Sequence, residues 1–342
     1  MTRPVRSLVE TSPKDTGLVF AALTLALAGV GDVLAGSGQA SATLPAGEPA
    51  RASQRRLPEA LDAPRREVRL PGAGLVSYYR AGPESGTPLL LVHSINAAPS
   101  AFEMRPLFEH YRTSRPVLAP DLPGFGFSDR LDRRYTPALF QEALSGLLRE
   151  VIQAPADVVA FSLSSEFAAA VAQSAPELIR SLVLISPTGF STRTLPGGKT
   201  GERVHGVLSL PGLSQGLFAA LTSRPSIRYF LGQSFVEPVP PELVDYAYAT
   251  THQPGARYAP LYFLSGQLFT QEATERLYAG VTQPVLVLHD RDPNINFDLL
   301  PGFLRGRPLW RVERIAPTLG LPHWEKPAET TAAMDRFWAG EG

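Results

Sequence analysis

Five short apolar runs place the strongest constraint on how this chain folds. Runs of this kind are typical of strands that are buried on both faces of a sheet. They cover residues 89–92, 117–119, 158–159, 182–185 and 285–288. Amphipathic stretches with helical spacing separate them, for example over residues 137–151. This alternation predicts an α/β fold with a mostly parallel central sheet and helices on both faces.

The length of 342 residues suits one α/β domain with an insertion. Residues 67–70 and 75–80 alternate around Pro71-Gly72 and predict a pair of edge strands. We therefore place the core at residues 67–188 and 282–342. Residues 189–281 break the alternation and are rich in aromatic and helically spaced apolar residues. They predict either a helical cap over an apolar pocket or extra helices that enlarge the core.

The N-terminal region differs in composition from the rest of the chain. Residues 16–31 carry no charge, but this run is shorter than the ~20 residues of a comfortable membrane span. Residues 1–35 are thus predicted to be an apolar leader, either a signal peptide or an anchor. Residues 36–66 predict a flexible linker. We expect a membrane-associated or exported protein, with membrane association through residues 16–31; the alternative is a cytoplasmic protein with an Ala-rich leader.

Charge and cysteine content exclude several classes of function. Lys plus Arg number 32 and Asp plus Glu number 32, so no net field attracts nucleic acid, and none is expected as a partner. The absence of cysteine removes disulfides, thiolate catalysis and cysteine-ligated metals. No metal-ligand cluster or phosphate-cradling glycine loop is visible in the sequence. We therefore predict no cofactor and no metal.

One serine stands where a strand turns sharply into a helix. The apolar run before Ser162 predicts a strand, and the alanine-rich sequence after it predicts a helix. This is the layout of a nucleophile elbow, in which small neighbours are needed because the turn is tight. Ala160 and Ser164 are small, but they lack the freedom of glycine at positive φ. A buried serine at the end of a core strand is the equally open alternative.

Several further motifs follow in an order that a known family requires. They are Leu-Leu-Leu-Val-His-Ser at residues 89–94, Ala-Pro-Asp-Leu-Pro-Gly-Phe-Gly-Phe-Ser-Asp at 119–129, Val-Leu-His-Asp-Arg-Asp-Pro at 287–293 and Pro-His-Trp-Glu-Lys-Pro at 322–327. Together with the elbow they resemble the serine-nucleophile branch of the α/β-hydrolase superfamily. The resemblance covers roughly residues 67–340. It implies the α/β-hydrolase fold, with the helical lid inserted before the strand that carries the catalytic acid.

The resemblance assigns a role to each residue of the site. Ser162 would attack a carbonyl carbon, and the backbone N–H groups of Leu163 and Ile95 would bind the oxyanion. Asp292 matches the acid that orients the catalytic histidine. Asp290 remains a second candidate for this acid, and a solvated Asp-Pro turn is the alternative for both. For His93, a structural position beneath the loop is favoured over a catalytic one.

The family's histidine motif, Gly-His-x-Pro-x-x-Glu-x-Pro, departs in this chain. Alignment on Pro322, Glu325 and Pro327 places Gly320 at the site of the catalytic histidine, and His323 comes three residues later. Three extended residues span ~10 Å, whereas a general base must approach its partner within ~3 Å. Either the loop folds differently and His323 reaches the serine, or the triad is broken.

Two hypotheses about function therefore remain. The first is a serine hydrolase that cleaves an ester-like bond of a small apolar molecule, with Ser162, His323 and Asp292 as its triad. The second is a catalytically degenerate hydrolase fold that binds a ligand or a partner without turnover. Ser94, which replaces a glycine of the family beside the oxyanion loop, is a further departure.

Overall fold

The structure is a computed structural model that describes residues 56–192 and 198–340. The predicted leader and residues 36–55 of the predicted linker lie outside the described residues. The last part of that linker is packed, contrary to prediction: Leu57, Ala60 and Leu61 are buried. The hydroxyl group of Tyr79 anchors the segment by accepting a hydrogen bond from the Ala60 N–H at 2.8 Å and donating one to Glu59. Apolar side chains over a strand therefore override the loop-like composition.

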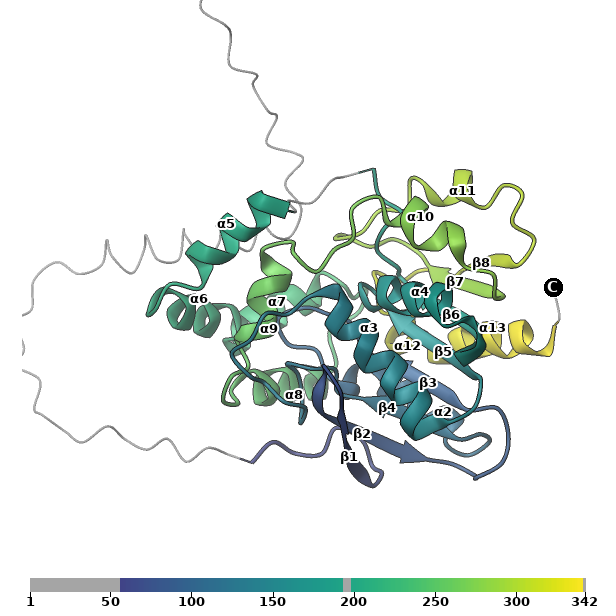
Figure 1. Ribbon diagram of the computed structural model, residues 1–342, viewed down its shortest axis with the longest axis horizontal. Coiled ribbons are helices and arrows are strands. Elements are labelled where there is room, and N and C mark those ends of the chain that lie inside the picture. The colour runs from purple at the N-terminus through teal and green to yellow at the C-terminus, as the bar shows by residue number, and fades with distance from the viewer. Residues whose placement is uncertain (1–55, 193–197, 341–342) are drawn as a thin grey trace, which may run out of the picture. The chain divides into compact units, whose positions relative to one another are not determined.

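The core is one eight-stranded sheet with the order β1-β2-β4-β3-β5-β6-β7-β8 (Figure 1). Strands β1 and β2 pair antiparallel, as do β2 and β4, and all other neighbours are parallel. This confirms the predicted mostly parallel sheet and its edge hairpin. The strands are β1 (Arg65–Leu70), β2 (Gly74–Ala81), β3 (Leu89–Val92), β4 (Val117–Pro120), β5 (Ala156–Phe161), β6 (Ile179–Ile185), β7 (Val285–His289) and β8 (Trp310–Arg314).

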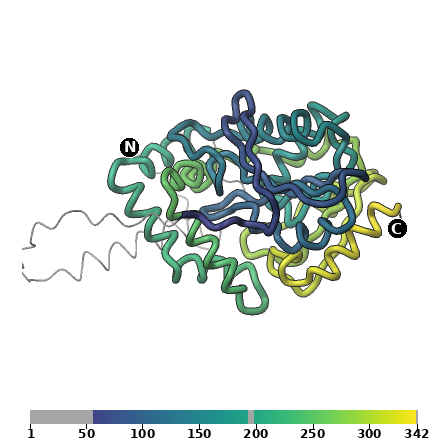
Figure 2. The backbone as a smooth tube through the Cα atoms, turned by 90° about the horizontal axis from the view of Figure 1, so that it is seen from below, coloured from purple at the N-terminus to yellow at the C-terminus, as the bar shows by residue number. Residues whose placement is uncertain are grey.

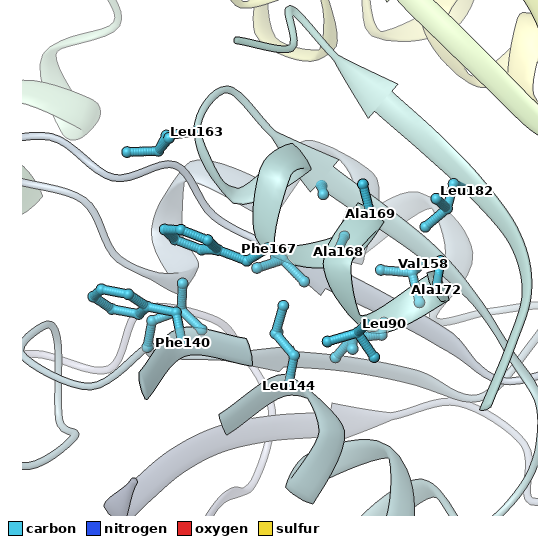
Figure 3. Close-up of a cluster of buried hydrophobic side chains, with 14 of the residues drawn as sticks. Leu90, Phe140, Leu144, Val158, Leu163, Phe167, Ala168, Ala169, Ala172 and Leu182 are labelled. Carbon is cyan, nitrogen blue, oxygen red and sulfur yellow. The ribbon is translucent and has the colours of Figure 1, made fainter. Parts of the chain in front are cut away.

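Helices cover both faces of the sheet. On one face, Phe140 of α3 stacks on Phe167 of α4 at 4.9 Å between ring centroids, in the same apolar cluster as Leu90 and Val158 (Figure 3). On the other face, α2 and α13 bury a second cluster that contains Phe108. The core elements are η1 (Ala101–Met104), α2 (Arg105–Tyr111), α3 (Pro137–Gly146), η2 (Leu147–Ile152), α4 (Ser164–Ser174), η3 (Pro176–Leu178), α11 (Leu300–Phe303), α12 (Pro322–Glu325) and α13 (Pro327–Ala339).

A helical insertion separates β6 from β7, as the sequence predicts. Figure 2 shows its first helices, in teal and green, on the side of the strands opposite to α13. Among the described residues, no single helix is long and apolar enough to cross a membrane. The inserted helices are α5 (Gly198–Leu208), α6 (Leu213–Leu221), α7 (Arg224–Gly232), α8 (Pro241–Thr251), α9 (Tyr258–Leu264), α10 (Ala273–Arg276) and η4 (Tyr278–Gly280).

The insertion packs on the loops at the carboxyl ends of the strands. Tyr246 of α8 stacks on Phe102 of η1 at 4.6 Å between centroids. Ala98, in the loop after β3, packs against Val244 and Ile227 of the insertion. The sheet order also places a topological switch point between β3 and β5, where open α/β sheets form their ligand crevice. The insertion therefore contacts the loop that borders this crevice.

Candidate active site

Ser162 occupies a strained turn between β5 and α4. Its φ is +55°, a left-handed value that non-glycine residues adopt at a cost of about 1–3 kcal/mol. Its N–H donates to the Ile185 carbonyl at 2.9 Å, and the residue is partly exposed. Ser164, at the second glycine position of the elbow, and its neighbour Ser165 both bond to the backbone: Ser164 Oγ donates to the His93 carbonyl at 2.6 Å and Ser165 Oγ to the Ala160 carbonyl at 3.2 Å. Small hydroxyl side chains thus hold the elbow.

The two backbone N–H groups that the sequence names as oxyanion donors lie in loops next to the serine turn in the sheet order. Leu163 directly precedes α4, and Ile95 follows β3, the neighbour of β5. Within the described residues, neither N–H donates a hydrogen bond. The N-terminus of α4 adds its positive dipole end beside Leu163. This arrangement is suited to bind a carbonyl oxygen on which negative charge develops.

A buried carboxylate that sequence reasoning missed holds the Ile95 loop. Glu103 accepts hydrogen bonds from Ser94 N at 2.9 Å, from Ser94 Oγ at 3.1 Å and from Asn96 Nδ2 at 3.0 Å. Burial raises its pKa, which these bonds only partly offset. A single acid inside the apolar sequence Ala-Phe-Glu-Met was the available signal. Ser94 therefore anchors the loop by its side chain where the family carries glycine.

His93 is structural, as predicted. It is fully buried, and its Nε2 accepts a hydrogen bond from the Leu122 N–H at 2.9 Å. Its Nδ1 lies 2.6 Å from the Ser94 carbonyl and must carry the proton, because a carbonyl only accepts. Burial lowers the pKa of His93 to about 4. The neutral ring of His93 therefore connects the loop after β3 to the backbone of Leu122.

The two candidate acids have different surroundings. Asp290 is engaged by the Arg314 guanidinium and by the Thr318 N–H at 2.9 Å, and these contacts lower its pKa although burial opposes them. Asp292 has no ion pair among the described residues. Its Oδ1 accepts from the N–H groups of Asn294 at 2.8 Å and Ile295 at 3.1 Å, while burial raises its pKa to about 6. Asp290 is thus paired with a cation, whereas among the described residues the Asp292 carboxylate accepts only from backbone N–H groups.

The free oxygen of Asp292 points at Gly320. A Cβ placed on Gly320 would lie 2.9 Å from Asp292 Oδ2, and the glycine has a φ of +126°. The Gly320 carbonyl accepts a hydrogen bond from Ser186 Oγ at 2.9 Å, and Ser186 follows the residue that pairs with Ser162. The structure therefore brings Asp292 against the position where the alignment expects the histidine to attach.

The ring of His323 contacts Phe161 and the backbone of Glu103. It is fully buried in α12, and its ring packs edge-on against Phe161 at 5.1 Å between centroids. Its Nε2 lies 3.0 Å from the Glu103 carbonyl, which also accepts from Trp324 Nε1 at 2.7 Å. The Nδ1 atom is buried and has no hydrogen-bond partner among the described residues, and burial lowers the pKa of His323 to about 4. Across residues 56–192 and 198–340, no hydrogen bond joins His323 to Ser162 or Asp292.

The described residues contain no group of three or more His, Cys, Asp or Glu that could hold a metal ion. The groups described above are a strained serine, two N–H donors that make no hydrogen bond within the described residues, and an acid that faces a glycine. The arrangement can bind and polarise a carbonyl group, and within residues 56–192 and 198–340 no side-chain base is hydrogen-bonded to the serine hydroxyl.

Comparison with known proteins gives the same fold and several hydrolytic relatives. The chain is 33% identical over 109 residues to a 2-hydroxymuconate semialdehyde hydrolase of Pseudomonas sp. (strain CF600), covering 31% of this chain and 38% of that protein. It is 43% identical over 74 residues to Esterase Rv0045c of Mycobacterium tuberculosis (strain ATCC 25618 / H37Rv), covering 21% and 25%. The matches thus span well under half of these curated relatives.

Among solved structures, a serine hydrolase involved in carbazole degradation superposes with a TM-score of 0.64 at 18% identity, over 80% of this chain and 98% of that one. Such a likeness shows the fold. The model of the alpha/beta hydrolase family matches residues 89–333, which is most of the chain and includes every residue of the site described above. By that match the chain belongs to the alpha/beta hydrolase family.

Proposed function

We propose that this family member binds a small, mainly apolar carbonyl compound at Ser162 and turns it over only weakly. The proposal rests on one observation. Asp292 Oδ2 lies close to the position of a Cβ on Gly320, where a triad would need a histidine side chain. The ring of His323, the only histidine after the acid, is engaged by Glu103. The serine hydroxyl therefore lacks the general base that makes it a strong nucleophile.

The parts of the site that remain support binding. The Leu163 and Ile95 N–H groups are free within the described residues, and a carbonyl oxygen is their natural acceptor. Removing one member of a triad leaves a residual rate of roughly 10³–10⁴ over water, which comes from the oxyanion hole and binding. We infer slow turnover of this order in place of efficient hydrolysis.

The ligand class follows from the insertion and from the relatives. Aromatic and aliphatic residues of the insertion, including Ile227 and Tyr246, pack over the loops around the crevice. The curated relatives named above are hydrolases, one of them an esterase. A small apolar ester or ketone is thus the compound class that we propose for this site.

A second candidate function is favoured by one specific observation. In the part of the chain that the structure describes, His323 Nδ1 is buried without a hydrogen-bond partner, which is an unfavourable arrangement for a polar atom. A rearranged loop around Gly320 that freed the ring would satisfy this nitrogen. It would assemble Ser162, His323 and Asp292 into a triad, and the protein would then be an efficient serine hydrolase for ester-like bonds.

Labelling with a fluorophosphonate separates the two candidates. The probe is applied to folded wild-type protein, to Ser162→Ala and to His323→Ala, and hydrolysis of a p-nitrophenyl ester is followed in parallel. We expect slow labelling that is lost in Ser162→Ala and is unchanged in His323→Ala. Fast labelling that falls at least a hundredfold in His323→Ala, with the variant still folded by circular dichroism, would contradict the proposal and establish the second candidate.

A further inference from the structure

The outer end of the insertion exposes an unusual concentration of apolar side chains. Val207 is 58% exposed, Leu210 52% and Leu213 43%, and they fall within seven residues of sequence. Residues 204–223 contain no Asp, Glu, Lys or Arg. We call the stretch from Val207 to Leu213, which joins α5 to α6, the α5–α6 tip. Exposed apolar groups clustered in this way mark an interaction surface.

The two helices that meet at the tip are sharply bent relative to each other and do not form one membrane-crossing helix. Helices α5 and α6 together pass the length and hydropathy criteria for a membrane-crossing segment, yet they are bent by 94°. In Figure 1 both lie at the outer edge of the insertion, far from β7 and β8. Helix α5 packs on α9, and α6 packs on α7. The bend therefore presents the connecting turn outward while the rest of both helices stays packed on the protein.

Two cationic side chains precede the apolar tip on the same face of α5. Lys199, Arg203 and Val207 follow at intervals of four residues, so they share one face of α5, and all three are exposed. At a rise of 1.5 Å per residue, the two cations lie about 6 and 12 Å behind Val207. Glu202, the acid of this helix, is neutralised by Arg134 at 3.5 Å. This face of α5 thus changes from apolar at Val207 to cationic at Arg203 and Lys199 within about 12 Å.

This sequence of groups matches the depth profile of a lipid surface. An interfacial helix buries its apolar residues about 5–10 Å into the boundary between headgroups and acyl chains. Lys and Arg one or two turns behind would then lie among the headgroups, where each cation is attracted by anionic lipid. A protein partner would not require this particular spacing of charge behind an uncharged tip.

We propose that the α5–α6 tip docks the insertion on an anionic phospholipid surface. Val207, Leu210 and Leu213 enter the interface, and Lys199 and Arg203 contact headgroup phosphates. The proposal does not depend on the chemistry at Ser162. It concerns a surface distinct from residues 16–31, so the leader has to be separated from it experimentally.

The chain contains no cysteine, which allows a site-specific probe in the full-length protein. An environment-sensitive fluorophore (NBD) is attached to Leu210→Cys and, as a matched control, to Leu309→Cys. Leu309 is a leucine of similar exposure, 50%, just before β8. Each protein is titrated with vesicles of phosphatidylcholine alone and with vesicles that contain 30% phosphatidylglycerol.

We expect a blue shift and a several-fold rise of emission for Leu210→Cys on the anionic vesicles, and no change for Leu309→Cys. Val207→Asp with Leu213→Asp should lower the lipid partition measured with this probe about tenfold or more. Arg203→Gln should lower it about fivefold. Leu131→Asp with Val312→Asp, at exposed positions elsewhere, should leave it unchanged.

Three results would overturn the proposal. If the protein floats with vesicles while the Leu210 probe stays unchanged, then the leader or another surface binds the lipid. If the probe responds equally to both vesicle types, the cations behind the tip play no role. If it shifts without vesicles as protein concentration rises, a second copy of the chain covers the tip.

Discussion

His323 Nε2 lies 3.0 Å from the carbonyl oxygen of Glu103, and the carboxylate of the same Glu103 holds Ser94 and Asn96 in the oxyanion loop. One residue therefore connects the histidine loop to the loop that carries Ile95. The carbonyl acts only as an acceptor, so Nε2 carries the proton and is not available as a base. In this structure His323 stabilises the loop that shapes the site.

His323→Ala should destabilise the fold more than it affects reactivity. The change removes a buried hydrogen bond and leaves space beside Phe161, which we expect to cost about 3 kcal/mol of unfolding free energy. Urea denaturation measures this loss. His323→Gln, which keeps an Nε2 donor for the Glu103 carbonyl, should recover part of it. A large loss of fluorophosphonate labelling with a small loss of stability would contradict the structural role.

Gly320→Ala should be strongly destabilising because of both φ and the contact with Asp292. We expect a cost of about 2–4 kcal/mol, and less in the Asp292→Ala background, with a coupling of about 1 kcal/mol. Gly306 has a φ of +77° and open space around it, so Gly306→Ala is the control for backbone strain alone. If Gly320→Ala costs no more than Gly306→Ala, then the close approach of Asp292 Oδ2 is wrong.

The elbow strain predicts the order of two substitutions at Ser162. Its φ of +55° suits glycine, so Ser162→Gly should be more stable than Ser162→Ala by about 1 kcal/mol. Thermal and urea unfolding of the two variants test this. Gln153, with a φ of +60° after η2, is a matched position far from the site, and Gln153→Gly against Gln153→Ala should show the same order. A reversed order only at Ser162 would argue against strain at the elbow.

Glu166 should make stability depend on pH. It is buried in α4, where burial raises its pKa to about 7, although hydrogen bonds from Thr188 Oγ1 and Thr270 N lower it. Between the unfolded value near 4.5 and about 7, the folded protein binds more protons than the unfolded chain. Stability therefore falls across this window as the pH rises, and levels off above it.

Glu166→Gln removes the titrating group. The free energy of unfolding of the variant relative to that of the wild type should therefore rise by about 3 kcal/mol as the pH is raised from 4.5 to 7. Urea denaturation at several pH values checks the difference. Glu177→Gln, at a residue without a comparable buried environment in η3, serves as the control. A difference that is constant with pH would mean that Glu166 is ionised in the folded state throughout.

The order of elements and the elbow could be predicted from the sequence because both have local causes. Apolar runs such as residues 89–92 are buried on both faces whatever the details of packing, and a strand-to-helix turn at Ser162 needs only small neighbours. The helical insertion was visible for the same reason, through helical spacing and aromatic content. The mismatch at Gly320 was visible too, because it is a matter of spacing along the chain.

Other features depended on contacts between residues distant in the sequence. The different surroundings of Asp290 and Asp292 come from Arg314 and Thr318, which lie 24 and 28 residues beyond Asp290 and bond to its carboxylate. The partner of His323 is the backbone of Glu103, 220 residues away, and Leu57 is buried by strands that follow it. Residue types and their spacing determined the architecture and the position of the serine turn, whereas the hydrogen-bond partners of the titratable groups were decided only by tertiary packing, since burial and acceptor geometry arise when distant segments meet.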